Sequence, residues 1–248
     1  MSFSHRARNW IRKQLIRRLL PMVPEGISRL FRHSLDRPFG NRYYQDRARD
    51  YDQQRLHQAS WTAEYRALQK ITTELGHGLS VLDVPVGSGR FFPLYGAVDW
   101  RVSGLDVSEE MLEVARTRSH GVLPTKPILI RGKATSLPFP DSEFDVVVCF
   151  RFLQSIVSFG DAQRVIAEIA RVTKRFAVLH LDVRPEGLPE GPYPKLRETM
   201  RGKLTWLQIQ DLLVAEGLRI QKNIGPMPHE SKNEFVLLCA VEDAQGTQ

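Results

Sequence analysis

The pattern of apolar and polar positions separates an N-terminal segment from a longer region in which helices and strands alternate. From about residue 60, helical spacing of apolar residues alternates with short apolar runs that are typical of buried strands. This alternation predicts an α/β fold with a doubly wound, mostly parallel sheet of seven strands. The predicted strands are residues 80–85, 101–106, 127–131, 144–150, 176–181, 218–220 and 235–241, and the predicted helices lie near 61–75, 108–118, 165–172 and 205–217.

Residues 1–50 are expected to form a basic, helical N-terminal arm. Apolar residues between Ile11 and Leu20 share one helical face, and arginine and lysine occupy the opposite face. Such a helix can lie on an anionic membrane surface. The alternatives are that it packs against the body of the protein or a second subunit, or that it serves as a targeting segment. The sequence leaves these alternatives open.

The net charge of the chain resides in this arm. The 248 residues carry a formal charge of +7, and residues 1–37 contain nine Lys and Arg against two acidic residues. The rest of the chain is therefore balanced, so a general affinity for nucleic acid is not expected of the globular part.

Composition excludes several classes of protein. With 42% hydrophobic and 25% charged residues, the chain is not intrinsically disordered. Its two cysteines lie in apolar runs and indicate neither a disulfide framework nor a metal site. No run of about 18 apolar residues predicts a membrane span. We expect a soluble, cytoplasmic protein, peripheral at the inner face of a membrane if the arm binds lipid, with one domain over 51–242 and a disordered tail over 243–248.

The loop after the first predicted strand carries the clearest chemistry. Gly87 and Gly89 allow a tight turn and close approach of the backbone to a ligand. A dinucleotide fingerprint would place a third glycine where the chain has Phe92. Asp83 disfavours a phosphate and suits a ligand with an ammonium group, and Asp106 is placed to accept hydrogen bonds from a ribose. The loop therefore predicts a nucleoside with an amino-acid end and no pyrophosphate.

Four segments in this order resemble the cofactor-binding half of class I S-adenosylmethionine-dependent methyltransferases, of the type related to enzymes of the ubiquinone and biotin pathways. The resemblance covers residues 79–150 and continues more weakly to about residue 241. It implies a Rossmann-like sheet, S-adenosylmethionine as cofactor, and methyl transfer to a small-molecule or lipid-linked acceptor. The segments are Val81 to Gly89, Gly104 to Leu112, Gly132 to Phe139 and Phe144 to Cys149.

The resemblance also implies a role for individual residues. Asp83, Gly87 and Gly89 would line the methionine end of the cofactor, and Asp106 would hold the ribose hydroxyls. The remaining implied contacts are Val107 and Met111 near the adenine, Lys133 and Ala134 at its edge, Phe150 and Arg151 on the methyl-donor side, and Tyr51 and Arg55 in an N-terminal element that closes over the cofactor.

The chain departs from the family pattern at several positions. Lys133 stands where relatives frequently have an acid, and a lysine cannot accept a hydrogen bond from the adenine amino group. Gln154 replaces a frequent histidine, and residues 173–175 replace a glycine-rich turn. These departures keep two alternatives open, a non-catalytic binding or assembly subunit and an RNA methyltransferase that uses the basic arm.

His180 is the one candidate for a catalytic base. It ends a predicted strand, and the ordinary pKa range of histidine suits proton transfer near neutral pH. The alternative is a buried structural histidine. Methyl transfer from a sulfonium depends mainly on positioning, so a base is needed only when the acceptor must lose its proton early.

Deleting residues 1–37 tests the membrane interpretation of the arm. The deletion lowers the formal charge from +7 to zero, so we expect it to abolish co-sedimentation with anionic liposomes. Equal co-sedimentation of the full-length and shortened proteins would show that the arm does not bind lipid.

Overall fold

The computed structural model describes residues 58–156, 159–183, 204–225 and 234–241. The predicted arm over 1–50, the predicted tail over 243–248, and both Tyr51 and Arg55 lie outside these residues. Within the described residues, no helix combines the length and the apolar character that crossing a bilayer requires.

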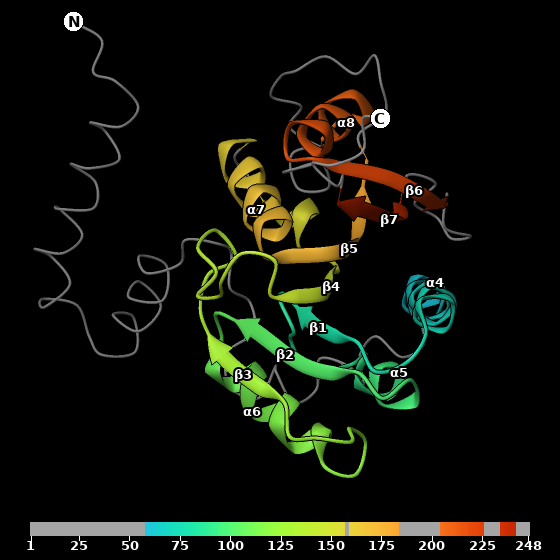
Figure 1. The fold of residues 1–248 in the computed structure, drawn as a ribbon, viewed down its shortest axis with the longest axis vertical. Helices are drawn as coiled ribbons and strands as arrows, with labels where there is room; N and C mark the ends of the chain where they lie inside the picture. Colours follow the sequence, from blue (N-terminus) through green and yellow to red (C-terminus); the bar gives the residue numbers. More distant parts are fainter. Residues whose placement is uncertain (1–57, 157–158, 184–203, 226–233, 242–248) are drawn as a thin grey trace, which may run out of the picture. The chain divides into compact units, whose positions relative to one another are not determined.

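The described chain alternates strands and helices, as the apolar pattern predicts (Figure 1). The strands are β1 (Ser80–Asp83), β2 (Arg101–Asp106), β3 (Ile128–Arg131), β4 (Phe144–Cys149), β5 (Thr173–Asp182), β6 (Leu218–Ile224) and β7 (Glu234–Val241). The helices are α4 (Ala59–Leu75), α5 (Phe92–Ala97), α6 (Glu109–Ser119), α7 (Phe159–Val172) and α8 (Trp206–Ala215), with a short 3-10 helix at Leu153–Ser155.

The seven strands form one sheet in the order β3-β2-β1-β4-β5-β7-β6. Strands β1 to β5 pair in parallel, and β7 runs antiparallel to both of its neighbours. The predicted doubly wound, mostly parallel sheet is therefore confirmed. The strand order changes direction between β1 and β4, which is where ligands bind in open α/β sheets.

Alternating side chains along the strands build two hydrophobic cores. One face of the sheet packs against α7 and α8, and the other packs against α4, α5 and α6. Figure 1 shows α7 and α4 on opposite sides of the sheet. Because β4 is buried on both faces, Val147 enters the first core while Val146 and Val148 enter the second.

Local sequence signals set the ends of several helices. The Ser108 hydroxyl accepts a hydrogen bond from the Met111 amide at the start of α6. Thr205 and Gln208 form the predicted capping box at the start of α8. Between α7 and β5 there is no turn, since β5 begins at Thr173 directly after the last residue of α7. Residues 173–175, which stand where the family has a glycine-rich turn, are thus the first residues of β5.

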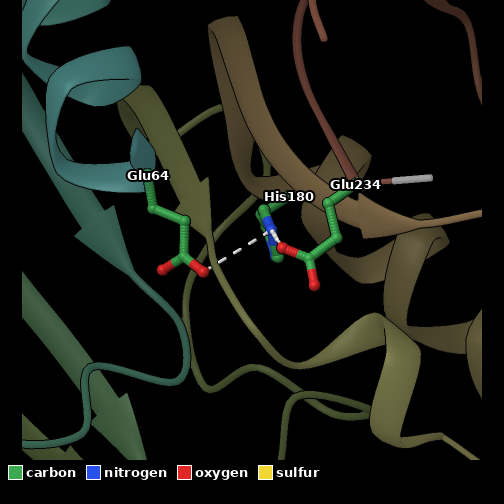
Figure 2. Close-up of side chains that lie close together, drawn as sticks. All are labelled: Glu64, His180 and Glu234. Carbon is green, nitrogen blue, oxygen red and sulfur yellow. Dashed lines mark ion pairs between the residues drawn. The ribbon is translucent and has the colours of Figure 1, made fainter. Parts of the chain in front are cut away.

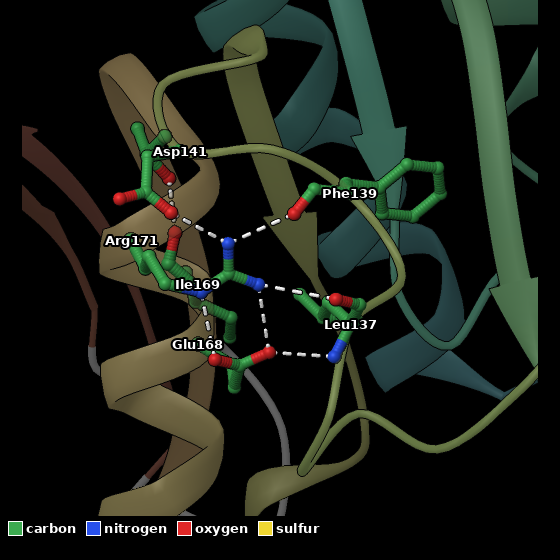
Figure 3. Close-up of polar contacts among 7 residues, drawn as sticks. Leu137, Phe139, Asp141, Glu168, Ile169 and Arg171 are labelled. Atoms are coloured by element: carbon green, nitrogen blue, oxygen red, sulfur yellow. Dashed lines mark hydrogen bonds and ion pairs between the residues drawn. The ribbon is translucent and has the colours of Figure 1, made fainter.

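A charged cluster holds the loop between β3 and β4 against α7 (Figure 3). Arg171 pairs with Glu168 and Asp141 and donates to the carbonyl oxygens of Leu137 and Phe139. These contacts order the part of the loop that leads into β4, near the amino ends of β4 and β5.

Gly104 of β2 permits the loop after β1 to lie close to the sheet. A Cβ atom at this position would lie 2.9 Å from the Cβ of Val86 and 2.8 Å from a methyl carbon of Leu129. Contacts this short require neighbouring atoms to move.

Gly104→Ala is therefore expected to lower the free energy of unfolding by about 1–3 kcal/mol, the usual cost of overpacking a core. Urea denaturation measures the loss. Gly121→Ala is the comparison with the opposite cause. A Cβ there meets no atom within 4 Å, and its φ of +70° makes its loss a backbone cost of about 1–2 kcal/mol, which Gly104 does not carry because its φ is not positive. An unchanged midpoint for Gly104→Ala would contradict the close packing.

Candidate functional site

The loops that follow β1, β2 and β4 meet at the carboxyl edge of the sheet, where its strand order reverses. They carry the residues that the sequence assigns to a ligand. The carbonyl oxygen of Leu105 in β2 accepts from the Val86 amide, and that of Val148 in β4 accepts from the Val84 amide. The loop after β1 is therefore bonded to both neighbouring strands.

The two glycines of this loop have different structural roles. Both have positive φ, +54° at Gly87 and +71° at Gly89, so both favour glycine. A Cβ at Gly89 would lie 2.6 Å from the ring of Phe92, whereas a Cβ at Gly87 would meet no atom within 4 Å. Packing within the protein therefore explains Gly89, and Gly87 is the glycine that leaves room beside the turn.

Asp106 joins the glycine turn to the end of β2. Its Oδ2 accepts from the Gly87 amide at 3.0 Å, and its Oδ1 accepts from the Ser108 amide at 2.9 Å. The side chain is 7% exposed, and this burial raises its pKa although the backbone hydrogen bonds act to lower it. Each carboxylate oxygen has a second lone pair for a further donor. Asp106 is thus oriented to accept two hydroxyl groups.

Asp83 lies deeper, at the end of β1, and is 2% exposed. Its Oδ2 accepts from the Tyr95 hydroxyl at 3.0 Å. Burial raises the pKa of Asp83 well above its ordinary value, while the Tyr95 hydrogen bond and the charge of Arg90 act to lower it. A nearby cation would relieve this cost of burial.

The residues predicted around an adenine differ in exposure. Met111 and Ala134 are buried, Val107 is half-buried and Lys133 is exposed. The Lys133 backbone forms an isolated bridge with Ser136, so a tight turn brings Ala134 to this edge. The exposed ammonium of Lys133 supplies no acceptor for an adenine amino group.

A buried polar cluster lies beyond the end of β4. The His180 ring stacks on Phe150 with centroids 5.4 Å apart, and its Nδ1 accepts from the Arg151 amide at 3.3 Å. Because Nδ1 accepts, the proton of a neutral ring would lie on Nε2, a buried atom that makes no hydrogen bond with the described residues. His180 is 0% exposed, which favours a positioning role over the expected role as a base.

Glu64 of α4 belongs to the same cluster, and the sequence interpretation did not single it out. Its Oε1 lies 3.8 Å from the Nε2 of His180, which is also 3.5 Å from the Oε2 of Glu234 in β7 (Figure 2). A signal for Glu64 exists in the sequence. It lies between Trp61 and Leu68 on the apolar face of α4, where an acid is unusual and needs a buried partner.

Glu64, His180 and Glu234 could in principle hold a metal ion, since one ligand atom from each lies within 4.8 Å of the others. The charges around Glu64 argue against it. Its two oxygens already accept from the guanidinium groups of Arg90 and Arg151, at 2.8 Å and 2.6 Å. A divalent cation would compete with both arginines at close range. The donor set fits an ion cluster better than a metal centre.

Gln154 lies in the 3-10 helix just after this cluster. Its Oε1 is buried and has no hydrogen-bond partner among the residues that the structure describes. Buried amide oxygens are normally bonded, so Gln154 offers an acceptor to a ligand at this edge.

A family model described as a methyltransferase domain matches residues 82–181. The match includes the loops after β1, β2 and β4, together with His180. Glu64 and Glu234 lie outside it.

Two curated relatives match parts of the chain. It is 36% identical over 119 residues to the demethylmenaquinone methyltransferase of Symbiobacterium thermophilum, covering 46% of this chain and 44% of that protein. It is 28% identical over 173 residues to the 27-O-demethylrifamycin SV methyltransferase of Amycolatopsis mediterranei, covering 63% and 62%. The chain thus spans less than two thirds of the length of either relative.

Solved structures share the fold. Magnesium protoporphyrin IX methyltransferase from Synechocystis PCC 6803, solved with bound SAH, has a TM-score of 0.58 and 17% identity over 73% of this chain and 84% of that chain. The described sheet and its helices therefore have the class I methyltransferase fold.

Asp83→Asn tests whether the buried carboxylate is retained at a cost in stability. Its raised pKa means that folding disfavours the ionised form, so the stability of the wild type falls as pH rises above the pKa of the unfolded carboxyl. Asparagine can still accept from Tyr95. We expect the urea midpoint of Asp83→Asn to exceed that of the wild type at pH 7 and to approach it in acid.

Asp145→Asn is the matched control, because the pKa of Asp145 is shifted in the opposite direction. Burial raises the pKa of Asp145, but hydrogen bonds from Ser80 and nearby positive charges leave it below its ordinary value. Its ionised form therefore stabilises the fold at neutral pH, an effect lost as pH falls through the folded pKa. A lower midpoint for Asp83→Asn than for the wild type at pH 7 would contradict the account of Asp83.

Proposed function

We propose that the chain, whose residues 82–181 match a methyltransferase domain model, is an S-adenosylmethionine-dependent methyltransferase acting on a small-molecule acceptor. The observation that carries the proposal is the position of Asp106. Its buried carboxylate lies where the strand order reverses, beside the open side of Gly87, with both oxygens oriented by backbone amides. This arrangement suits the two hydroxyls of a ribose.

The other assignments follow from the loop at the same edge in which each residue lies. Asp83 would attract the ammonium of the methionine end, because an ammonium would offset its burial in a dry site. Met111 and Val107 would contact the adenine, with Ala134 offering backbone groups to its edge. Phe150 and Arg151, which follow β4, would border the transferred methyl group.

When bound, S-adenosylmethionine supplies a methyl group that its sulfonium has already activated. The residues of the chain would therefore act mainly by alignment and exclusion of water, which can contribute on the order of 7–11 kcal/mol. The complete burial of His180 favours acceptors that need little help in losing a proton. The buried Oε1 of Gln154 would accept a hydrogen bond from the acceptor.

The acceptor class is supported by the relatives. One curated relative is named for demethylmenaquinone and another for a demethylrifamycin, which are organic small molecules. The amphipathic basic arm of the sequence further favours a lipid-linked acceptor delivered from an anionic membrane surface.

A binding or assembly subunit without catalysis is the second candidate, and Lys133 favours it. Without an acid at this position, the site lacks an expected acceptor for adenine. Binding of the cofactor without any incorporation of labelled methyl into lipid or small-molecule fractions would support this second function.

Asp106→Ala tests the proposal. Loss of an acceptor for two ribose hydroxyls should weaken the binding of S-adenosylmethionine and of its demethylated product by about 1–3 kcal/mol, measured by isothermal titration calorimetry. Asp99→Asn is the control, because Asp99 precedes the opposite end of β2, with its side chain 71% exposed. Absence of binding by the wild type would refute the proposed function, and equal dissociation constants for wild type and Asp106→Ala would refute the placement of the ribose.

A further inference from the structure

Three charged side chains from separate segments meet beneath the carboxyl edge of the sheet. Glu64 comes from α4, Arg90 ends the glycine turn, and Arg151 follows β4. The Oε2 of Glu64 accepts from Arg90 at 2.8 Å, and its Oε1 accepts from Arg151 at 2.6 Å. The carboxylate is 0% exposed, so one buried acid bridges the glycine turn and the segment after β4.

Arg90 is held by aromatic and polar contacts in addition to Glu64. Its guanidinium carbon lies 3.4 Å from the centroid of a Trp61 ring and 4.4 Å from that of Phe91. The same group donates to the carbonyl oxygen of Trp61 at 2.9 Å. Cation–π contacts of this kind strengthen when the cation is removed from water, and the Arg90 side chain is only 10% exposed. The first turns of α4 are thereby joined to the glycine turn.

Arg151 is held in an unusual backbone conformation. Its φ is +54°, a region that side chains other than glycine rarely adopt. Its amide donates to the Nδ1 of His180 while its guanidinium pairs with Glu64. The backbone after β4 therefore depends on two contacts, one of which ends at the same carboxylate that holds the glycine turn.

A buried ion cluster of this kind contributes little to the stability of the fold. Removing charges from water costs about as much as their attraction returns, and apolar residues of similar size are often as stable. What a buried ion cluster provides is geometry, since a carboxylate between two guanidinium groups fixes their separation. Arg90 also places its charge where it lowers the pKa of Asp83.

We propose that Glu64 is a positioning residue that sets the spacing between the glycine turn and the segment after β4, and with it the pocket for the methionine end of the cofactor. This inference rests on the proposed function. Glu64 would act on the ligand through the two arginines that it holds, Arg90 and Arg151. It lies outside the part of the chain that the family model matches.

Glu64→Gln is the direct test, because glutamine keeps the shape and removes the charge. We expect at least tenfold weaker binding of the demethylated cofactor by calorimetry. The control is Asp145→Asn, which removes the charge of a half-buried carboxylate that also has two donors, the amide and hydroxyl of Ser80, but lies at the amino end of the strands. The control should lower the melting temperature yet change affinity less than twofold. Affinity within twofold of the wild type for Glu64→Gln would overturn the proposal.

A double variant covers the case in which Glu64→Gln does not fold. Glu64→Met with Arg90→Met removes one charge of each sign, so it leaves the net charge of the cluster unchanged. Apolar replacement of a buried ion pair is often neutral for stability, and the remaining Arg151 side chain is 25% exposed to water. We expect a folded protein that has still lost at least tenfold in affinity. A folded double variant with wild-type affinity would overturn the proposal.

Hydrogen–deuterium exchange separates this inference from the proposed function, because it needs no ligand. In the unliganded protein, Glu64→Gln should raise exchange at least tenfold for amides of residues 86–91 and 150–152, and Asp145→Asn should not. If the wild type fails to bind the cofactor, the proposed function fails while the exchange result still decides the role of Glu64. Unchanged exchange in both loops would contradict that role.

Discussion

The hydrogen bond from the Gly87 amide to the Asp106 carboxylate is the contact on which the geometry of the site depends. It ties the turn after β1 to the end of β2 at 3.0 Å, and the Ser108 amide holds the second oxygen of the same group. The turn can approach the sheet because Gly104 has no side chain to obstruct Val86. One carboxylate thereby orients the glycine turn and the Ser108 amide at the start of α6. Its remaining lone pairs lie at the edge where the strand order reverses.

Around this turn the protein buries several charges. Asp83, Asp106 and Glu64 are all buried, and each has protein donors that offset part of the cost of leaving water. At Asp83 the donors do not fully offset the cost of burying the charge, so its pKa is raised well above its ordinary value. In the absence of a ligand, an apolar residue in place of Asp83 would make the fold more stable, because it would avoid this cost of burial. An unfavourable charge kept at a strand end is typical of a site selected for binding rather than for stability.

Much of the fold was predictable from the sequence, because it follows from local patterns. Continuous apolar runs such as 144–150 identify central strands, and Thr205 with Gln208 marks the start of a helix. The helix α5 was missed because it has six residues and contains Pro93 and Gly96, which interrupt the helical pattern. The cluster at Glu64 was missed because its partners are 26 and 87 residues away, a pairing that no local pattern encodes. From the sequence, Gly87 and Gly89 have the same predicted role. Their different roles follow from the packing around them in the folded protein.

The central claim is that the carboxyl edge around Asp106 binds S-adenosylmethionine, and a crystal structure of the protein with the demethylated cofactor tests it most directly. The account predicts ribose hydroxyls on the Asp106 carboxylate and the methionine end beside Gly87, with the Arg90–Glu64–Arg151 contacts intact. A cofactor bound elsewhere, or a ribose that does not touch Asp106, would contradict the account.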